Sequence, residues 1–289
     1  YHKRMIGIIY NPVAAGGKYK TRMRGLLVLL DSLQIKYEYH ESEGPGDAGK
    51  LALEMSETCS TIIPAGGDGT VSEVLTALKD KDVRLAILPY GSGNDSFISV
   101  YGDDCSDEGV LEHVMSETDL RADCFMVNGK YRGFLLVSYG FGADLVKNFK
   151  EKGRTYIYQA FKMLFGVHIR NYTITVNGTT RDVRSEFVSV INTGYAGGGM
   201  RVNSKSNFTD GEFELMILHE SSMFRRFANF AALARGKLDS QPNMEVIRTK
   251  ECSIIAKDDD CINVDGELYY TQNVDIRITE GGLRFAYRR

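Results

Sequence analysis

The sequence lacks a long hydrophobic run. Its longest apolar stretches, such as residues 26–30, fall well short of the ~18 residues expected of a membrane-spanning helix. We therefore expect no transmembrane segment, and no signal peptide is visible. The five cysteines are odd in number, scattered and without a CxxC pair, which favours reduced thiols over a disulfide framework or a zinc site. These absences predict a cytoplasmic protein.

The sequence also has little net charge. Its 35 Lys and Arg against 38 Asp and Glu give −3, so bulk electrostatics predict no nucleic-acid partner. The hydrophobic fraction of 43% and the charged fraction of 25% are typical of a folded globular protein. A length of 289 residues allows two domains of roughly 150 residues each.

Several common catalytic motifs are missing. A P-loop is absent, because the nearest match has Pro12 in place of the first glycine and Tyr19 in place of the hydroxyl residue. Residues 91–96 have Ser96 in place of the last glycine of GxGxxG. No HRD, DFG, GxSxG or HExxH occurs. The sequence therefore does not support a Rossmann dehydrogenase, a protein kinase, a serine hydrolase of the nucleophile-elbow type or a zinc protease.

The first part of the chain alternates strand-like and helix-like patterns. Expected strands are residues 3–10, 36–40, 61–65 and 84–89. Three helices between them have apolar faces made by Met23, Leu26, Leu27, Leu30 and Leu33, by Ala48, Leu51, Ala52 and Met55 after a capping Asp47, and by Val71, Val74, Leu75 and Leu78. This order predicts a mostly parallel sheet covered by helices.

From about Asp123 onward, strand-like segments alternate with turn dipeptides. The strands are expected at 131–139, 172–176, 187–192, 213–218, 253–256, 262–264 and 274–278, and the turns at 128–129, 177–178, 210–211, 265–266 and 281–282. An all-β second domain follows. Helical inserts at 155–165 and 224–235 are rich in aromatics, and they either pack on the sheet or face lipid.

The most informative stretch is Gly-Gly-Asp-Gly-Thr at residues 66–70, between a strand and a helix. Three glycines let the backbone approach a ligand closely, and the helix that follows points its free N–H groups at an anion. Asp68 would repel a bare phosphate, which predicts a divalent cation between the two. The alternative is a tight turn with a capping aspartate. The first interpretation predicts a Mg-nucleotide site.

A second glycine loop at residues 89–95 also follows a strand and ends in a carboxylate. Ligands of parallel sheets bind at the carboxyl ends of strands, where Asn11, Ser42 and both loops are expected. The loops supply the hydroxyls of Thr70 and Ser92 and the carboxylates of Asp68 and Asp95, a set that suits a polyphosphate with its metal.

Seven motifs occur in an order that resembles the diacylglycerol kinase catalytic-domain family. They are Asn11-Pro12, residues 66–70, 91–95, 140–144 and 195–200, Asp210-Gly211, and Asp265-Gly266-Glu267. The resemblance spans residues 6 to about 287 and is greatest to the bacterial soluble lipid kinases of a family that also includes sphingosine and ceramide kinases.

The resemblance implies an α/β nucleotide-binding domain at 1–124, completed by a returning strand at 280–289, and a β-sandwich domain at 125–279, with the active site in the cleft between them. It also implies ATP and Mg²⁺ as cofactors. The implied ATP contacts are Asn11, Pro12, Val13, Ala14, Ala15, Ser42, Gly66, Gly67, Asp68, Gly69, Thr70, Val71, Ser72, Glu73, Ser92, Gly93 and Asn94. The implied metal residues are Asp68, Asp95 and Asp123 at one position and Asn207, Asp210 and Glu212 at another.

On the acceptor side, the resemblance implies Glu267 as general base with Asp265 close by. A carboxylate near the attacking hydroxyl accelerates phosphoryl transfer by about 10²–10⁴. Asp265-Gly266 is equally typical of a hairpin turn, and we expect both roles. The chain departs from the family at Ala14, where a hydroxyl residue is usual, and at Ser96, where the family continues Phe-Ala-Arg.

The expected function is an ATP-dependent lipid kinase acting on a lipid such as diacylglycerol at the cytoplasmic membrane face. The alternatives are a NAD kinase, which shares the 66–70 motif, and a nucleotide- or lipid-binding relative without turnover. Basic residues beside aromatics are candidates for headgroup contact, namely Lys147, Lys150, Lys152, Arg154 and Lys162 with Tyr156, Tyr158, Phe161 and Phe165. A solvated charged surface fits them equally, and a homodimer is compatible with the sequence.

Overall fold

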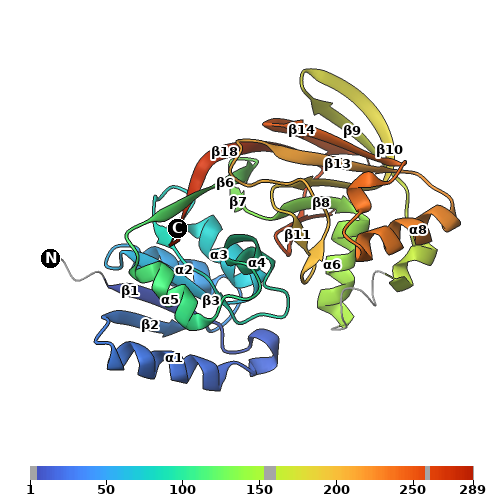
Figure 1. Cartoon of the computed structure of the whole chain (residues 1–289). Helices are drawn as coiled ribbons and strands as arrows, with labels where there is room; N and C mark the ends of the chain where they lie inside the picture. Colours follow the sequence, from blue (N-terminus) through green and yellow to red (C-terminus); the bar gives the residue numbers. More distant parts are fainter. Residues whose placement is uncertain (1–4, 153–160, 258–260, 289) are drawn as a thin grey trace. The chain divides into compact units, whose positions relative to one another are not determined.

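The computed structural model describes residues 5–152, 161–257 and 261–288 (Figure 1). The chain divides into two compact units. Unit 1 comprises Tyr1–Ala122 and Gly281–Arg289, and unit 2 comprises Asp123–Glu280. The predicted boundaries lay at 124/125 and 279/280.

Unit 1 is an α/β domain around a parallel sheet. Its strands are β1 (Ile6–Tyr10), β2 (Tyr37–Glu41), β3 (Thr61–Gly66), β4 (Arg84–Leu85) and β5 (Leu88–Pro89). Its helices are α1 (Lys20–Ser32), α2 (Asp47–Met55), α3 (Asp68–Ala77), α4 (Asp95–Tyr101) and α5 (Asp107–Met115). Figure 1 shows α1 on the opposite side of β1 from α2 and α3. The predicted βαβ order is confirmed.

The strand order in unit 1 is β18-β4-β3-β1-β2, with β5 beside β3. All these pairs are parallel. The strand β18 (Asn273–Ala286) is the last of the chain, and its Arg284 and Phe285 pair with Arg84 and Leu85 of β4. The end of the chain therefore returns to the first unit, as the resemblance implies.

Unit 1 differs from the sequence-based expectation at three points. The expected strand 84–89 is interrupted and forms β4 and β5. Leu33 is 56% exposed, because α1 ends at Ser32 and Leu33 leaves the buried face. Asp47 does not cap α2; Gly46 stands at the N-cap with φ +83°, and the Asp47 carboxylate accepts the Glu43 N–H at 2.9 Å. Helices α4 and α5 were not anticipated.

Arg84 is the buried cation of this sheet, and we expect it to be critical for stability. Its side chain donates to the Asp119 carboxylate at 2.6 Å and to four backbone carbonyls, those of Val114, His113, Ser116 and Thr118. Arg84→Met removes all five of these bonds at a buried position, so urea denaturation should show a loss of about 3–5 kcal/mol. Arg121→Met removes an exposed ion pair with Asp82 and should cost less than about 1 kcal/mol. Equal losses in the two variants would contradict this account.

Unit 2 is a β-sandwich domain of antiparallel strands. They are β6 (Asp119–Val127), β7 (Tyr131–Gly133), β8 (Leu136–Gly140), β9 (Arg170–Val176), β10 (Thr179–Ile191), β11 (Tyr195–Ala196), β12 (Met200–Arg201), β13 (Phe213–His219), β14 (Met244–Thr249), β15 (Glu251–Ala256), β16 (Cys261–Val264), β17 (Glu267–Tyr270) and most of β18. Antiparallel pairing joins β6–β7, β8–β10, β8–β16, β9–β10, β9–β15, β10–β13, β11–β12, β13–β14, β15–β18 and β16–β17. Together with unit 1, these strands confirm the predicted fold class.

Helices α6 (Phe141–Lys152) and α8 (Met223–Ala234) and the short 3₁₀ turns η2 (Leu164–Gly166) and η3 (Leu238–Ser240) belong to unit 2. The predicted insert at 224–235 is thus confirmed as α8. Of the insert at 155–165, residues 155–160 lie outside the described residues, and so do Arg154 and the side chains of Lys150 and Lys152. None of the helices in the described parts of the chain is long and apolar enough to cross a membrane.

The turn dipeptides of unit 2 mostly behave as predicted. Asn128-Gly129, Asn177-Gly178 and Asp265-Gly266 all have positive φ at both residues, which is the geometry of a type I′ hairpin turn. The pair at 281–282 was wrong as a turn, because it lies inside β18. The single strand expected at 131–139 was also wrong: it breaks between β7 and β8, where backbone N–H groups turn toward the Asp265 carboxylate.

Candidate active site

The carboxyl ends of the central strands of unit 1 lie at one edge of the sheet. Tyr10 is the register partner of both Glu41 and Ala65, and Ala65 is in turn the partner of Leu88. The residues that follow these strand ends therefore lie together, and two contacts connect them. Asn11 Nδ2 donates to Thr70 Oγ1 at 3.1 Å, and the Ser42 N–H donates to the Tyr10 carbonyl at 2.8 Å.

The two glycine loops touch each other through their backbones. A Cβ atom on Gly91 would lie 2.2 Å from the Gly67 Cα atom, and one on Gly66 would lie 2.4 Å from Thr70 Oγ1. Only glycine fits at either position. Gly67 is the N-cap of α3 and no side chain caps this helix, so its first N–H groups are available to an anion. Ser92 is exposed at the tip of the second loop.

The Asp68 carboxylate holds the two loops together. Its Oδ1 accepts the Ser96 N–H at 2.8 Å and its Oδ2 accepts the Asp95 N–H at 3.1 Å, so it caps the start of α4. The capping role weighed from the sequence is therefore present, although it serves the second loop's helix. Asp68 thereby lies next to Asp95, which is buried. Two neighbouring carboxylates beside a phosphate loop suit a hydrated Mg²⁺.

The second glycine loop is anchored at both ends. Asn94 has φ +61°, and its side chain accepts from the Gly91 N–H at 2.8 Å and donates to the Gly91 carbonyl at 3.2 Å. The Tyr90 hydroxyl donates to Asp107 at 2.7 Å, and Arg22 pairs with the same carboxylate. Burial and this hydrogen bond raise the pKa of Tyr90, so the phenol stays protonated. The loop is thus held rigidly.

The remaining predicted ATP residues differ in how available they are. The loop after β1 has Ala15 and Gly16 in left-handed conformations, with φ +48° and +70°, and Val13 at its start is 77% exposed. Val71 and Ser72 are buried within α3. Glu73 accepts the Gly46 N–H at 2.9 Å. The structure therefore offers backbone groups and exposed loop residues at this edge, rather than the side chains of Val71 and Ser72.

In unit 2, Asp123 comes together with the predicted second metal position. Its carboxylate accepts the Gly211 N–H at 2.7 Å, and its N–H donates to the Phe208 carbonyl at 2.7 Å. Arg248 pairs with the Asp210 carboxylate and, at 3.0 Å, with Glu212. A guanidinium therefore already neutralises both of these side chains.

The remaining metal residue, Asn207, accepts from the Thr209 N–H at 3.2 Å and from the Thr209 hydroxyl at 2.8 Å. Among the described residues, no three His, Cys, Asp or Glu side chains are grouped closely enough to hold a metal ion directly. Binding through water, which the resemblance implies, stays a prediction.

The Asp265-Gly266-Glu267 hairpin is fixed by one buried carboxylate. Asp265 accepts the N–H groups of Phe134, Leu135 and Leu136 at 2.6, 3.0 and 2.8 Å. Glu267, half-buried, begins β17 directly after this turn. Asp265 is thus a structural residue of the hairpin that presents Glu267, and the sequence had anticipated the turn but not the three bonds.

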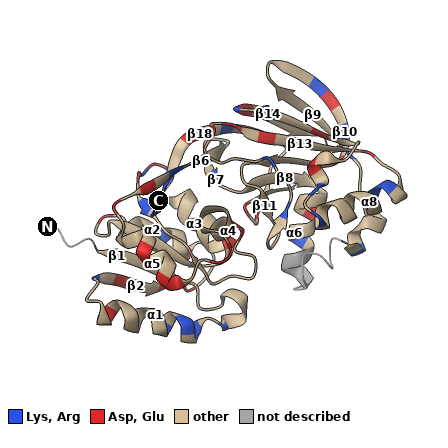
Figure 2. Cartoon of the chain, in the orientation of Figure 1, with Lys and Arg blue, Asp and Glu red and all other residues tan. Residues whose placement is uncertain are grey.

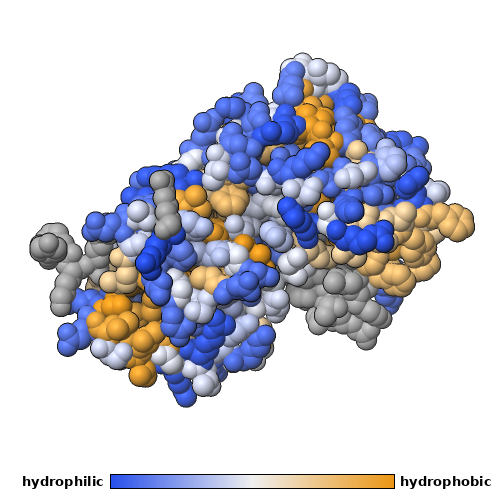
Figure 3. Space-filling model, in the orientation of Figure 1, coloured by the Kyte–Doolittle hydropathy of each residue, from blue (hydrophilic) through white to orange (hydrophobic). Residues whose placement is uncertain are grey.

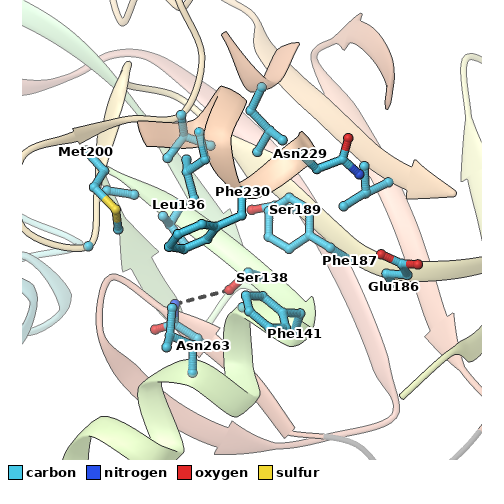
Figure 4. Close-up of a pocket in the computed structure, with 18 of the residues that line it drawn as sticks. Leu136, Ser138, Phe141, Glu186, Phe187, Ser189, Met200, Asn229, Phe230 and Asn263 are labelled. Carbon is cyan, nitrogen blue, oxygen red and sulfur yellow. Dashed lines mark hydrogen bonds between the residues drawn. The ribbon is translucent and has the colours of Figure 1, made fainter. Parts of the chain in front are cut away.

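A largely apolar cavity of about 150 Å³ lies in unit 2 (Figure 4). Its walls come from β8, β10, β11, β12, β13, β16, α6, α8 and the turns η2 and η3. Two motifs that carry the family resemblance reach it. Phe141 and Gly142 line it from residues 140–144, and Ala196, Gly197 and Met200 line it from residues 195–200.

The glycine that begins the motif at residues 140–144 is required by the backbone conformation at that position. Gly140 has φ +65°, and a Cβ atom there would lie 2.8 Å from the Glu186 carbonyl. Glycine therefore allows the chain to turn from β8 directly into α6, which closes one side of the cavity.

This cavity was not predicted from the sequence. Its polar lining residues include Asn229 on α8 and the buried ion pair of Glu186 with Arg226, and none of them was anticipated. One signal was present: Asn229 and Arg226 share a face of a helix whose other residues, apart from Arg225, are apolar. Polar residues on such a face are candidate lining positions.

The sequence matches two domain families in succession. Residues 5–127 match the diacylglycerol kinase catalytic domain, and residues 143–286 match the YegS C-terminal NAD kinase beta sandwich-like domain. The chain therefore belongs to the diacylglycerol kinase catalytic-domain family, a family of kinases.

Individual relatives are similar over nearly the full length. A diacylglycerol kinase of Bacillus subtilis is 26% identical, and one of Staphylococcus saprophyticus is 23% identical; each alignment covers 90% of this chain and 88% of the relative. The crystal structure of a diacylglycerol kinase from Bacillus anthracis superposes with a TM-score of 0.76 at 19% identity, covering 99% of this chain and 97% of that one. This structural similarity supports the fold described above for the chain.

Proposed function

We propose that the protein is an ATP-dependent lipid kinase that transfers the γ-phosphate to a hydroxyl of a membrane lipid such as diacylglycerol. One observation carries the proposal. The apolar cavity and the Glu267 hairpin share a wall: Asn263 lines the cavity, and its Oδ1 accepts the Gly266 N–H at 2.7 Å. Leu136, another lining residue, accepts the Asp265 N–H at 3.0 Å. A lipid chain in the cavity would therefore lie against β8 and β16, the two strands whose residues hydrogen-bond the turn that precedes the proposed base.

Phosphoryl transfer from ATP needs hydrogen-bond donors to the phosphates, cations that neutralise their charge, and one base that accepts the proton of the acceptor hydroxyl. Backbone N–H groups at the start of α3 and in the second glycine loop bind the phosphates of ATP. Asp68 and Asp95 would hold a Mg²⁺ ion through water, and this ion would neutralise charge on the phosphates. Glu267 accepts the proton of the attacking hydroxyl, and Asp265 keeps the hairpin in place through its three backbone bonds.

The cavity also bears on the main alternative. A NAD kinase must bind a dinucleotide with charged phosphates and several ribose hydroxyls, whereas most of this lining consists of Leu, Val, Ile, Phe, Met, Ala and Gly side chains. Such a surface favours an aliphatic chain over NAD. A binding protein without turnover shares the cavity, but it has no need of Glu267 beside it.

One assay separates the three functions. The protein is incubated with Mg²⁺, γ-labelled ATP and either diacylglycerol-containing vesicles or NAD. We expect label in the lipid. Label in NAD, or no transfer by a protein that binds ATP, would contradict the proposal.

We further propose that the protein acts at the cytoplasmic membrane face through an aromatic surface of unit 2, made by Phe161, Phe165, Met223 and Phe224. These side chains are 39–89% exposed, and Phe161 and Phe165 contact each other and Phe227. Figure 3 shows apolar residues gathered on the surface at α8, and Figure 2 shows basic but no acidic residues on this helix. Exposed aromatics beside Arg225 and Lys162 suit an anionic lipid surface.

Phe224→Ser should therefore weaken binding to vesicles that contain anionic lipid. Phe224 is 89% exposed, and insertion of one such ring contributes about 1.5–3 kcal/mol, so sedimentation should show at least a roughly tenfold lower partition coefficient. Val28→Ser, at a 68% exposed position on α1, is the matched control and should partition as the parent protein does. If the Phe224 variant partitions onto the vesicles as the parent protein does, this surface does not bind the membrane.

A further inference from the structure

The polar side chains that line the cavity are almost all paired. Ser138 accepts from Asn263 Nδ2 at 3.1 Å, and Ser189 donates to the Val137 carbonyl at 2.8 Å. Glu186 accepts from Arg226 Nε at 2.9 Å and from the N–H and hydroxyl of Ser221. These groups have their hydrogen-bonding needs met within the protein.

Asn229 is the exception. It lies on α8, lines the cavity and is 4% exposed, and neither its Nδ2 nor its Oδ1 has a hydrogen-bond partner in the part of the chain that the structure describes. Arg226 and Leu233, one turn away on either side, also line the cavity, so Asn229 is on the cavity-facing side of the helix. Figure 4 shows it apart from the bonded Ser138 and Asn263 pair. An unpaired buried amide destabilises a protein unless a ligand pairs with it.

We propose that Asn229 recognises the acyl carbonyl of the lipid, donating from Nδ2 to that oxygen. This inference rests on the proposed lipid kinase function and narrows its substrate class to acyl lipids. A carbonyl oxygen is a strong hydrogen-bond acceptor. The oxygen of an alkyl ether is a weak acceptor, and the alkyl chain attached to that oxygen contains no acceptor. The apolar walls hold the hydrocarbon equally well in both cases, so Asn229 separates an acyl lipid from an ether lipid of the same length.

The test uses two short lipids with the same terminal hydroxyl, 2-hydroxyethyl dodecanoate and 2-dodecyloxyethanol, below their micelle concentrations. Calorimetry measures the Kd of each without ATP. For the unchanged protein we expect the ester to bind about tenfold more tightly, the factor that one net hydrogen bond contributes. In Asn229→Leu the two affinities should become equal.

Two further measurements exclude a structural explanation. Asn229→Leu replaces an unpaired amide with an apolar group of similar size, so the melting temperature without ligand should stay the same or rise. Phe230→Leu, a neighbouring lining residue, should weaken both lipids while keeping the tenfold ratio. A clear fall in the melting temperature of Asn229→Leu would assign the residue to folding instead.

The proposal is overturned if Asn229→Leu still binds the ester more tightly than the ether, or if neither lipid binds. It is also overturned if the unchanged protein binds both lipids equally, which is the result expected if a water molecule occupies the hydrogen-bonding groups of Asn229. Phosphate transfer, measured separately with γ-labelled ATP, distinguishes the two levels of the account. If phosphate is transferred to both lipids but the ester does not bind more tightly, only the role of Asn229 is contradicted. If the ester binds more tightly but no phosphate is transferred, only the kinase function is contradicted.

Discussion

Replacing Glu267 by Gln should lower kcat for lipid phosphorylation by about 10²–10⁴. The amide keeps the size of the side chain but does not accept a proton from the attacking hydroxyl. ATP binding and lipid binding should change little, because no bound substrate needs the charge before the proton moves. Initial rates with γ-labelled ATP at saturating lipid measure the effect.

The matched control is Glu251→Gln. Glu251 pairs with Arg277 at 3.3 Å on the surface of the same unit, and both side chains are largely exposed, so the control should keep the full rate. Retention of lipid phosphorylation by Glu267→Gln would remove Glu267 as the base, and equal losses in both variants would indicate a general defect.

Gly91→Ala should weaken ATP binding by about 10- to 100-fold. The added Cβ atom would lie 2.2 Å from the Gly67 Cα atom, so the two glycine loops must move apart and their N–H groups lose alignment. Such overpacking typically costs about 1–3 kcal/mol, which corresponds to this range of affinity. Calorimetry with Mg-ATP measures it directly.

A second glycine supplies the control. Gly25 lies inside α1 with no atom within 4 Å of an added Cβ, so Gly25→Ala should leave ATP binding unchanged and raise stability by about 0.5–1 kcal/mol. Unaltered ATP affinity in Gly91→Ala would show that the loops do not bind the nucleotide.

The sequence predicted unit 1 well because its local signals and its tertiary structure agree. Val71, Val74, Leu75 and Leu78 were expected on one helix face, and all four are buried. The carboxyl ends of parallel strands necessarily share one edge, so Asn11, Ser42 and both glycine loops were expected to meet there. The predictions for Asp47 and Leu33 were wrong because both residues lie at helix ends, where a shift of one residue changes the role of a side chain.

Unit 2 was less predictable because its local breaks have distant causes. The strand expected at 131–139 is divided by hydrogen bonds to Asp265, more than 125 residues later in the sequence. The cavity likewise joins residues of β8, β10, β12, β16, α6 and α8, which no spacing in the sequence connects. Asp265 was expected as a turn residue near the base; its buried position and three accepted bonds required the tertiary structure.

The central claim is that the lipid acceptor reacts from the cavity of unit 2, and filling that cavity tests it most directly. Met200 is half-buried and lines the cavity, so Met200→Trp reduces its volume, whereas Met115→Trp adds the same bulk at a position that is 59% exposed on α5. The measurement is kcat/KM for diacylglycerol in vesicles, with the Kd of ATP determined alongside. We predict a loss of at least about tenfold in Met200→Trp alone, with ATP affinity unchanged. Equal kcat/KM in both variants and in the parent protein would contradict the account.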